Sequence, residues 1–105
     1  MSTSSITRDE AIRRLHTIES KIRSLGVRRL ALFGSVLRNE ARPDSDVDVL
    51  VEFAPNEKTF DRFMALADLL EDTLERRVEA ITTESLSPFI GPHILAEATD
   101  VLRAA

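Results

Sequence analysis

Several residue types are absent or scarce in the 105-residue sequence, and each absence excludes a class of protein. The chain has no cysteine, which excludes disulfides, thiolate catalysis and cysteine-based zinc sites. It has only two histidines, so a histidine-rich metal centre is not expected. The formal net charge is −4, whereas a general DNA- or RNA-binding protein would carry a basic excess. Direct nucleic-acid binding is therefore not expected.

Long apolar runs are also missing. No stretch approaches the ~20 residues that a membrane-spanning helix needs, and no signal-peptide pattern opens the chain. We therefore expect a cytoplasmic protein without a membrane partner. Hydrophobic residues make up 43% and charged residues 30%, as in ordinary globular proteins. The length predicts a single domain over residues 1–105, with residues 1–5 frayed.

Helical patterns occupy the start, the middle and the end of the chain. Thr7 and Glu10 form a capping box before an apolar stripe that Gly26 would end. Thr59 is placed to cap a long central helix. Pro92 suits the first turn of a last helix, whose apolar stripe we expect to run to residue 102.

Three stretches between these helices predict strands: residues 30–33, 46–53 and 78–81. A single helical turn is expected over residues 36–40. The order α-β-α-β-α-β-α predicts an α/β (α+β) fold in which helices flank a small mixed sheet. Neither a repeat nor a linker divides it.

Two carboxylates, Asp46 and Asp48, lie on one face of the second predicted strand, about 7 Å apart. Such a pair is costly to desolvate, and a divalent cation would relieve the repulsion. Hard oxygen ligands suit Mg²⁺, which also binds substrate phosphates. Alternatively, the two residues are ordinary solvated acids on an exposed strand face.

Gly34 and Ser35 lie between a strand and a helix start, where backbone N–H groups and a hydroxyl can bind phosphate. Arg38 follows close enough for its guanidinium to contact the same phosphate. When each feature is considered alone, a plain turn with an N-cap explains Gly34 and Ser35 better, and a solvated surface arginine explains Arg38 better.

Glu79 lies inside the otherwise apolar third strand. If that strand lies beside the Asp46–Asp48 strand, Glu79 could hold a second metal ion or accept a proton from an attacking hydroxyl. It could also be an edge-strand acid facing water. Ser45 either supports the aspartates by a hydrogen bond or only ends the preceding loop.

Taken together, Gly34-Ser35-x-x-Arg38 followed by Ser45-Asp46-x-Asp48 resembles the signature of the DNA-polymerase-β-like nucleotidyltransferase superfamily, and above all its minimal nucleotidyltransferase (MNT) proteins. The resemblance covers nearly the whole chain, including residues 60–63, 77–79 and 86–98. It implies that Asp46, Asp48 and Glu79 are catalytic and bind Mg²⁺, with two ions expected. It also implies that Gly34, Ser35, Arg38 and Ser45 bind the nucleotide. The third acid is typically Asp in this superfamily. Glu79 is one methylene longer, so we expect the activity to be moderated.

The resemblance also implies a function. Many MNT proteins of this size resemble antitoxins that transfer AMP from ATP onto a tyrosine of a helical HEPN-domain ribonuclease toxin. The chain lacks a substrate domain, so we expect the acceptor on a partner protein. The alternative is a non-catalytic antitoxin that neutralises its partner by binding alone. A small-molecule nucleotidyltransferase acting on an antibiotic is a weaker third hypothesis.

Overall fold

The computed structural model describes residues 5–103; the expected fraying of the N-terminus falls mainly on Met1–Ser4, which lie outside them. Its elements are, in chain order, α1 (Arg8–His16), α2 (Glu19–Ser24), β1 (Val27–Phe33), α3 (Gly34–Leu37), β2 (Val47–Phe53), α4 (Phe60–Leu74), β3 (Val78–Thr82), the 3₁₀ turn η1 (Thr83–Ser85), α5 (Gly91–Glu97) and β4 (Thr99–Arg103).

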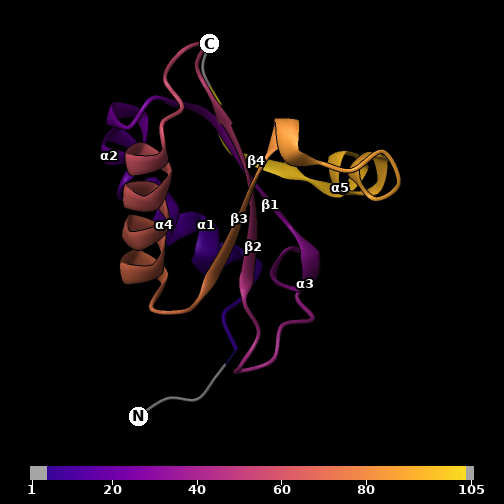
Figure 1. The fold of residues 1–105 in the computed structure, drawn as a ribbon. Helices are drawn as coiled ribbons and strands as arrows, with labels where there is room; N and C mark the ends of the chain where they lie inside the picture. Colours follow the sequence, from indigo (N-terminus) through magenta and orange to yellow (C-terminus); the bar gives the residue numbers. More distant parts are fainter. Residues whose placement is uncertain (1–4, 104–105) are drawn as a thin grey trace.

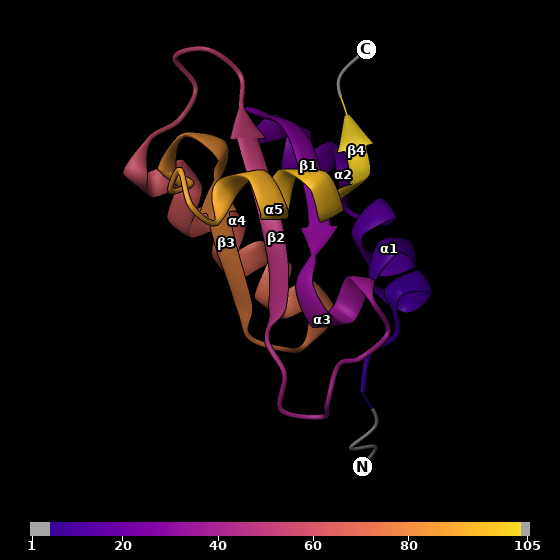
Figure 2. The same cartoon turned by 90° about the vertical axis from the view of Figure 1, so that its right-hand side faces the viewer.

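The four strands form one mixed sheet in the order β3-β2-β1-β4. β1 pairs antiparallel with β2 and β4, whereas β2 and β3 are parallel and joined by the crossover helix α4. Figure 1 shows α1, α2 and α4 on one face of the sheet. Figure 2 shows α5 lying across part of the opposite face. The expected mixed sheet flanked by helices is therefore confirmed.

The two sheet faces differ in composition because side chains alternate along each strand. Val47, Val49 and Val51 of β2 are fully buried beneath the layer that contains α4. The opposite face of β2 carries Asp48, Leu50 and Glu52, of which only Leu50 is buried, under α5. The predicted alternation of β2 is confirmed, and it leaves a partly polar face where α5 ends.

The expected helix starts are also confirmed. The Thr7 hydroxyl accepts the Glu10 N–H at 3.1 Å, and the Thr59 hydroxyl accepts the Arg62 N–H at 3.1 Å. The single N-terminal helix that we predicted is instead two helices, because the chain turns at residues 17–18. The Thr17 hydroxyl donates to the Arg14 carbonyl and so competes with helix continuation. Gly26 ends α2 with φ +89°, as expected for a C′ glycine.

The prediction for the C-terminus was wrong. We expected a helix through residue 102, but α5 ends at Glu97 and the chain continues as β4. Val101 and Leu102 are buried, at 8% and 5% exposure. They pack in the sheet because β4 covers the free edge of β1, which would otherwise present unpaired backbone groups.

Candidate active site

Three adjacent strands, β1, β2 and the edge strand β3, bring the Gly34 turn, Asp48 and the exposed Glu79 into one region. Phe33, the last residue of β1, is paired with Asp48, and Asp48 is paired with Glu79. Directly paired residues of adjacent strands project to the same face. The structure therefore brings Glu79 beside the Asp46–Asp48 segment, on the face that α5 crosses.

The carboxyl groups of Asp48 and Glu79 are close enough to interact strongly. Partial burial of Asp48 raises its pKa to about 6, with further contributions from the charge of Glu79, a hydrogen bond to Glu79 and the charge of Asp46. The nearby Arg38 charge acts in the opposite direction. Burial and the neighbouring carboxyl groups therefore both disfavour the ionised form of Asp48.

Asp46 lies one residue before β2, and its carboxylate pairs with Arg77 at 3.5 Å. Within residues 5–103, no group of three acidic or histidine side chains is arranged to hold a metal ion. A three-carboxylate site would therefore require Asp46 to turn from Arg77 toward Asp48. The donor set still suits a hard divalent cation, since it is made of carboxylate oxygens, and burial together with the charges of Glu79 and Asp46 raises the pKa of Asp48.

Gly34 makes the turn from β1 into α3. Its φ is +78°, in the left-handed region that favours glycine. A Cβ atom at this position would collide with the Asp48 carboxylate and would lie 3.2 Å from the Asp48 Cβ. Only glycine therefore allows this backbone to approach the acids so closely. Ser35 follows as the second residue of α3 and is half-buried.

Arg38 ends α3, and its guanidinium binds two carboxylates. Its Nε donates to Glu40 at 2.9 Å and its Nη1 donates to Glu97 at 2.7 Å. Glu97, the last residue of α5, also accepts the Gly34 N–H. Two of the predicted phosphate-binding residues are therefore joined by one acidic side chain.

Ser45 has a clear role within its own loop, because its hydroxyl accepts the Arg42 N–H at 2.8 Å. Contact with a nucleotide stays a prediction for this residue. The Nε2 atom of His16 lies 2.9 Å from the Val101 carbonyl oxygen and so links α1 to β4.

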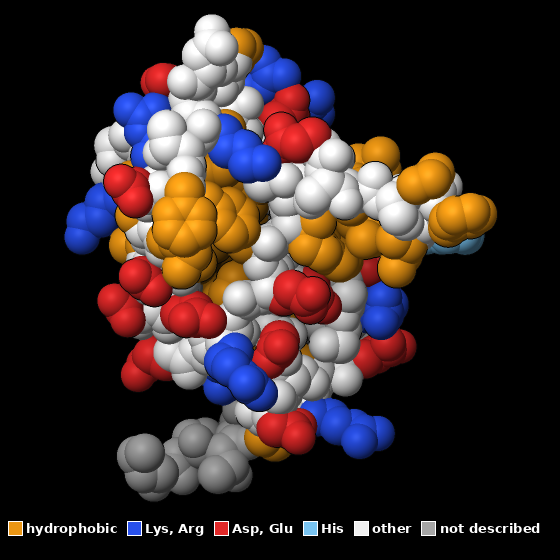
Figure 3. Space-filling model, viewed as in Figure 1, with side chains coloured by type: hydrophobic (Ala, Val, Ile, Leu, Met, Phe, Trp, Pro, Cys, Tyr) orange, Lys and Arg blue, Asp and Glu red, His pale blue; other side chains and the backbone are white. Residues whose placement is uncertain are grey.

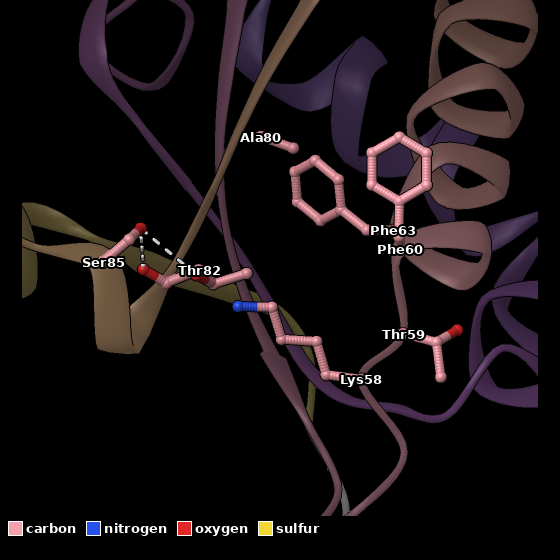
Figure 4. A pocket seen from close by; sticks show the side chains of 7 residues that line it. All are labelled: Lys58, Thr59, Phe60, Phe63, Ala80, Thr82 and Ser85. Carbon is pink, nitrogen blue, oxygen red and sulfur yellow. Dashed lines mark hydrogen bonds between the residues drawn. The ribbon is translucent and has the colours of Figure 1, made fainter.

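Two recesses lie near these residues. The polar one, of about 250 Å³, is lined by Ser45, Asp46 and Arg77 among others. A larger one of about 380 Å³, shown in Figure 4, lies between the start of α4 and the end of β3. It is lined by Ala80 and Thr82, which alternate with Glu79 along β3, so it opens on the sheet face opposite to the acids.

Sequence reasoning missed two participants, Glu97 and Arg77. Both lie in segments that carried the family resemblance, but nothing local assigns them to the site. Glu97 is 63 residues from Gly34 in the chain, and their contact depends on how α5 packs.

A glycine turn beside acidic strand residues is an arrangement that can bind phosphate groups together with a divalent cation. The chain belongs to the nucleotidyltransferase domain family, whose model matches residues 13–101. Enzymes of this family generally use ATP and a divalent metal ion. No helix among residues 5–103 has the length and apolar character needed to cross a membrane.

Named relatives agree with this assignment. The protein adenylyltransferase MntA of Thermococcus cleftensis is 39% identical over 84% of this chain and 87% of its own. MJ0435 of Methanocaldococcus jannaschii, a proposed protein adenylyltransferase, is 42% identical over 73% of this chain and 82% of its own.

Solved structures show the same fold. The structure of a proposed minimal nucleotidyltransferase matches with a TM-score of 0.79 and 33% identity, over 90% of this chain and 95% of that chain. A tri-AMPylated HEPN toxin of Shewanella oneidensis in complex with its MNT antitoxin matches with a TM-score of 0.64, over 90% of this chain and 73% of that chain. At 18% identity, the latter similarity concerns the fold alone.

Proposed function

We propose that this protein transfers AMP from ATP to a hydroxyl group of a partner protein and thereby acts as an antitoxin. The observation that carries the proposal is the register of Phe33, Asp48 and Glu79 across three adjacent strands, which places the Gly34 turn against the Asp48 carboxylate. Relatives that are 39% and 42% identical and bear the name protein adenylyltransferase support the reaction class.

The site residues have distinct roles in this proposal. Asp46, Asp48 and Glu79 hold Mg²⁺, for which we propose two ions, and Gly34, Ser35 and Arg38 bind the triphosphate. The bound metal would supply positive charge to the phosphates and lower the pKa of the acceptor hydroxyl.

The transfer itself is a balanced substitution at phosphorus. The acceptor oxygen forms a bond to the α-phosphorus, the bond from that phosphorus to the bridging oxygen breaks, and pyrophosphate leaves. Glu79 accepts the hydroxyl proton. Asp48 and Arg38 hold the reacting groups in position, which is most of what a protein contributes to phosphoryl transfer.

The partner that we propose is a helical HEPN-domain toxin, because a structurally similar complex holds an AMPylated HEPN toxin. The acceptor that we propose is a tyrosine, as the family resemblance implies. This chain has no tyrosine, so any tyrosine modification must occur on another protein. A cytoplasmic location, where ATP and Mg²⁺ are available, is part of the proposal.

Exposed apolar side chains offer surfaces for such a partner. Figure 3 shows that they gather over the start of α4 and around α5. The side chain of Phe60 at the start of α4 is 77% exposed, and that of Phe89 before α5 is 87% exposed.

The experiment is incubation of the purified chain with ATP labelled at the α-phosphate, Mg²⁺ and the product of the neighbouring gene as the candidate partner. We expect the label on a tyrosine of that protein. If the double variant Asp46→Asn/Asp48→Asn labels the partner equally well, the site assignment is wrong.

The second candidate is a non-catalytic antitoxin that blocks its partner by binding. The observation that favours it is that Asp46 is paired with Arg77 rather than with a third acid. The family resemblance, which implies Asp at the position of Glu79, motivates the same candidate. It requires that the folded double aspartate variant still neutralises the toxin in cells, whereas adenylylation requires that neutralisation is lost.

A further inference from the structure

Glu97 is an acidic residue for which the proposed reaction has no use, yet it contacts the phosphate-binding residues. One carboxylate oxygen accepts the Gly34 N–H, and the other accepts Nη1 of Arg38 at 2.7 Å. Its position is set by packing, since Ile94, one turn earlier in α5, is buried against Ala31, Phe33 and Leu50. The contact is therefore built into the way α5 lies on the sheet.

Glu97 is negatively charged at neutral pH. The Gly34 N–H, and to a smaller extent Arg38, lower the pKa of its carboxyl group. A carboxylate at a helix C-terminus faces the negative end of the helix dipole, which is unfavourable. The two hydrogen bonds offset that cost. The space beside the Gly34 N–H and the Arg38 guanidinium therefore favours an anion.

The Glu97 carboxylate accepts one hydrogen bond from a backbone N–H and one from a guanidinium. The same pair of donors can bind two oxygens of a phosphate group. These two donors, Gly34 and Arg38, are the ones that the proposed function assigns to the triphosphate. A carboxylate and a phosphate cannot occupy the same donors together, and their negative charges repel.

We propose that the Glu97 carboxylate occupies the triphosphate position in the nucleotide-free protein and competes with ATP for it. This inference rests on the proposed function, because it assumes that ATP binds at Gly34 and Arg38. When ATP enters, the Glu97 side chain rotates away, Arg38 keeps its bond to Glu40, and the Gly34 N–H passes to a phosphate oxygen. Glu97 thus sets the nucleotide affinity of the enzyme.

The first test measures the Kd of Mg·ATP for the wild-type chain and for Glu97→Gln by calorimetry. We expect Glu97→Gln to lower the Kd about tenfold, because the competing charge is gone. The matched control is Glu19→Gln, which removes a carboxylate that pairs with Arg23 at 2.9 Å and leaves Gly34 and Arg38 untouched, and it should change the Kd less than twofold. Glu97→Asp provides a second variant in case the amide disturbs folding: it keeps the charge but is one methylene too short to bridge both donors, and should also lower the Kd.

The second readout is the amide signal of Gly34. The chain has three glycines, so glycine-selective ¹⁵N labelling yields three resolvable amides, with Gly26 and Gly91 as internal references. We expect Glu97→Gln and Mg·ATP each to shift the Gly34 signal, and the effect of ATP to be larger in the wild type.

The outcomes distinguish failure of the proposed competition by Glu97 from failure of the proposed function. If wild type binds Mg·ATP but neither folded Glu97 variant binds it more tightly, the competition is refuted and the proposed function stands. If neither wild type nor the variants bind Mg·ATP, both fail.

Discussion

The two faces of the sheet show how one strand serves two purposes. The face under α4 is closed, and the β2 side chains that point into it are fully buried valines. The face under α5 is mixed: Leu50 is buried, while Asp48 lies half-buried beside Glu79. The buried apolar side chains of the closed face stabilise the fold, whereas the carboxyl groups of Asp48 and Glu79 repel each other on the open face. Changes on the two faces should therefore affect different measurements.

The largest expected effect separates activity from folding. Asp48→Asn should reduce kcat/KM for AMP transfer at least ~10³-fold, since it removes a carboxylate proposed to hold the metal ion. The variant should still fold, because Asp48 contributes nothing to the apolar core. The measurement is transfer kinetics together with thermal unfolding; substantial transfer by the folded variant would refute the role of Asp48.

The second effect concerns the closed face alone. Leu70→Ala should lower the free energy of unfolding by about 3 kcal/mol, because Leu70 is fully buried and the change leaves a cavity. Leu95→Ala in α5 is the matched control, because that side chain is 48% exposed, and should cost less than about 0.5 kcal/mol. Chemical denaturation measures both, and equal losses would show that α5 is packed as tightly as α4.

The third effect tests whether Gly34 is needed to leave room for the Asp48 carboxylate or only to form the turn between β1 and α3. Gly34→Ala should cost about 1–2 kcal/mol for its positive φ and should also abolish transfer, because the new Cβ displaces the Asp48 carboxylate. Gly26→Ala is the control, since Gly26 also has a positive φ but its Cβ would meet Glu57. Urea denaturation and transfer assays on both variants should show similar instability but lost activity only for Gly34→Ala. Full transfer by Gly34→Ala would contradict the close approach of this turn to the acids.

The smallest effect is the pH dependence of stability without metal. The pKa of Asp48 is about 6 in the folded protein and ordinarily 3.8, so the folded state binds its proton more tightly. Stability should therefore fall as the pH rises from about 4 to about 6 and then level off. After allowance for solvent screening we expect about 1 kcal/mol. In denaturation experiments, Asp48→Asn should be more stable than wild type at pH 7.5 and equal to it below pH 4. The prediction is contradicted if, between pH 4 and pH 7.5, the wild type gains stability relative to Asp48→Asn.

Several features of the two sheet faces were predictable from the sequence. The β2 alternation and the Thr59 cap are local patterns, and the structure confirms them. The family signature also placed Gly34, Asp48 and Glu79 in one region. Such features depend on neighbours within a few residues, where spacing carries the information.

The remaining features were hidden because they depend on long-range packing. Residues 99–103 continue a helical apolar pattern. They nevertheless form β4, because they pair with the otherwise free edge of β1. The bonds from Glu97 to Gly34 and Arg38 exist only because α5 packs across the sheet. Arg77 similarly holds Asp46 through the parallel approach of β3 to β2.

The central claim is that the acids on the open face support transfer of AMP to a partner protein. The most direct measurement is the intact mass of the helical partner after co-expression with the wild-type chain and with Asp46→Asn/Asp48→Asn. We predict that the partner gains one or more AMP groups on tyrosine with the wild-type chain and none with the variant. An unmodified partner that is nevertheless neutralised by both chains would contradict the account and establish neutralisation by binding alone.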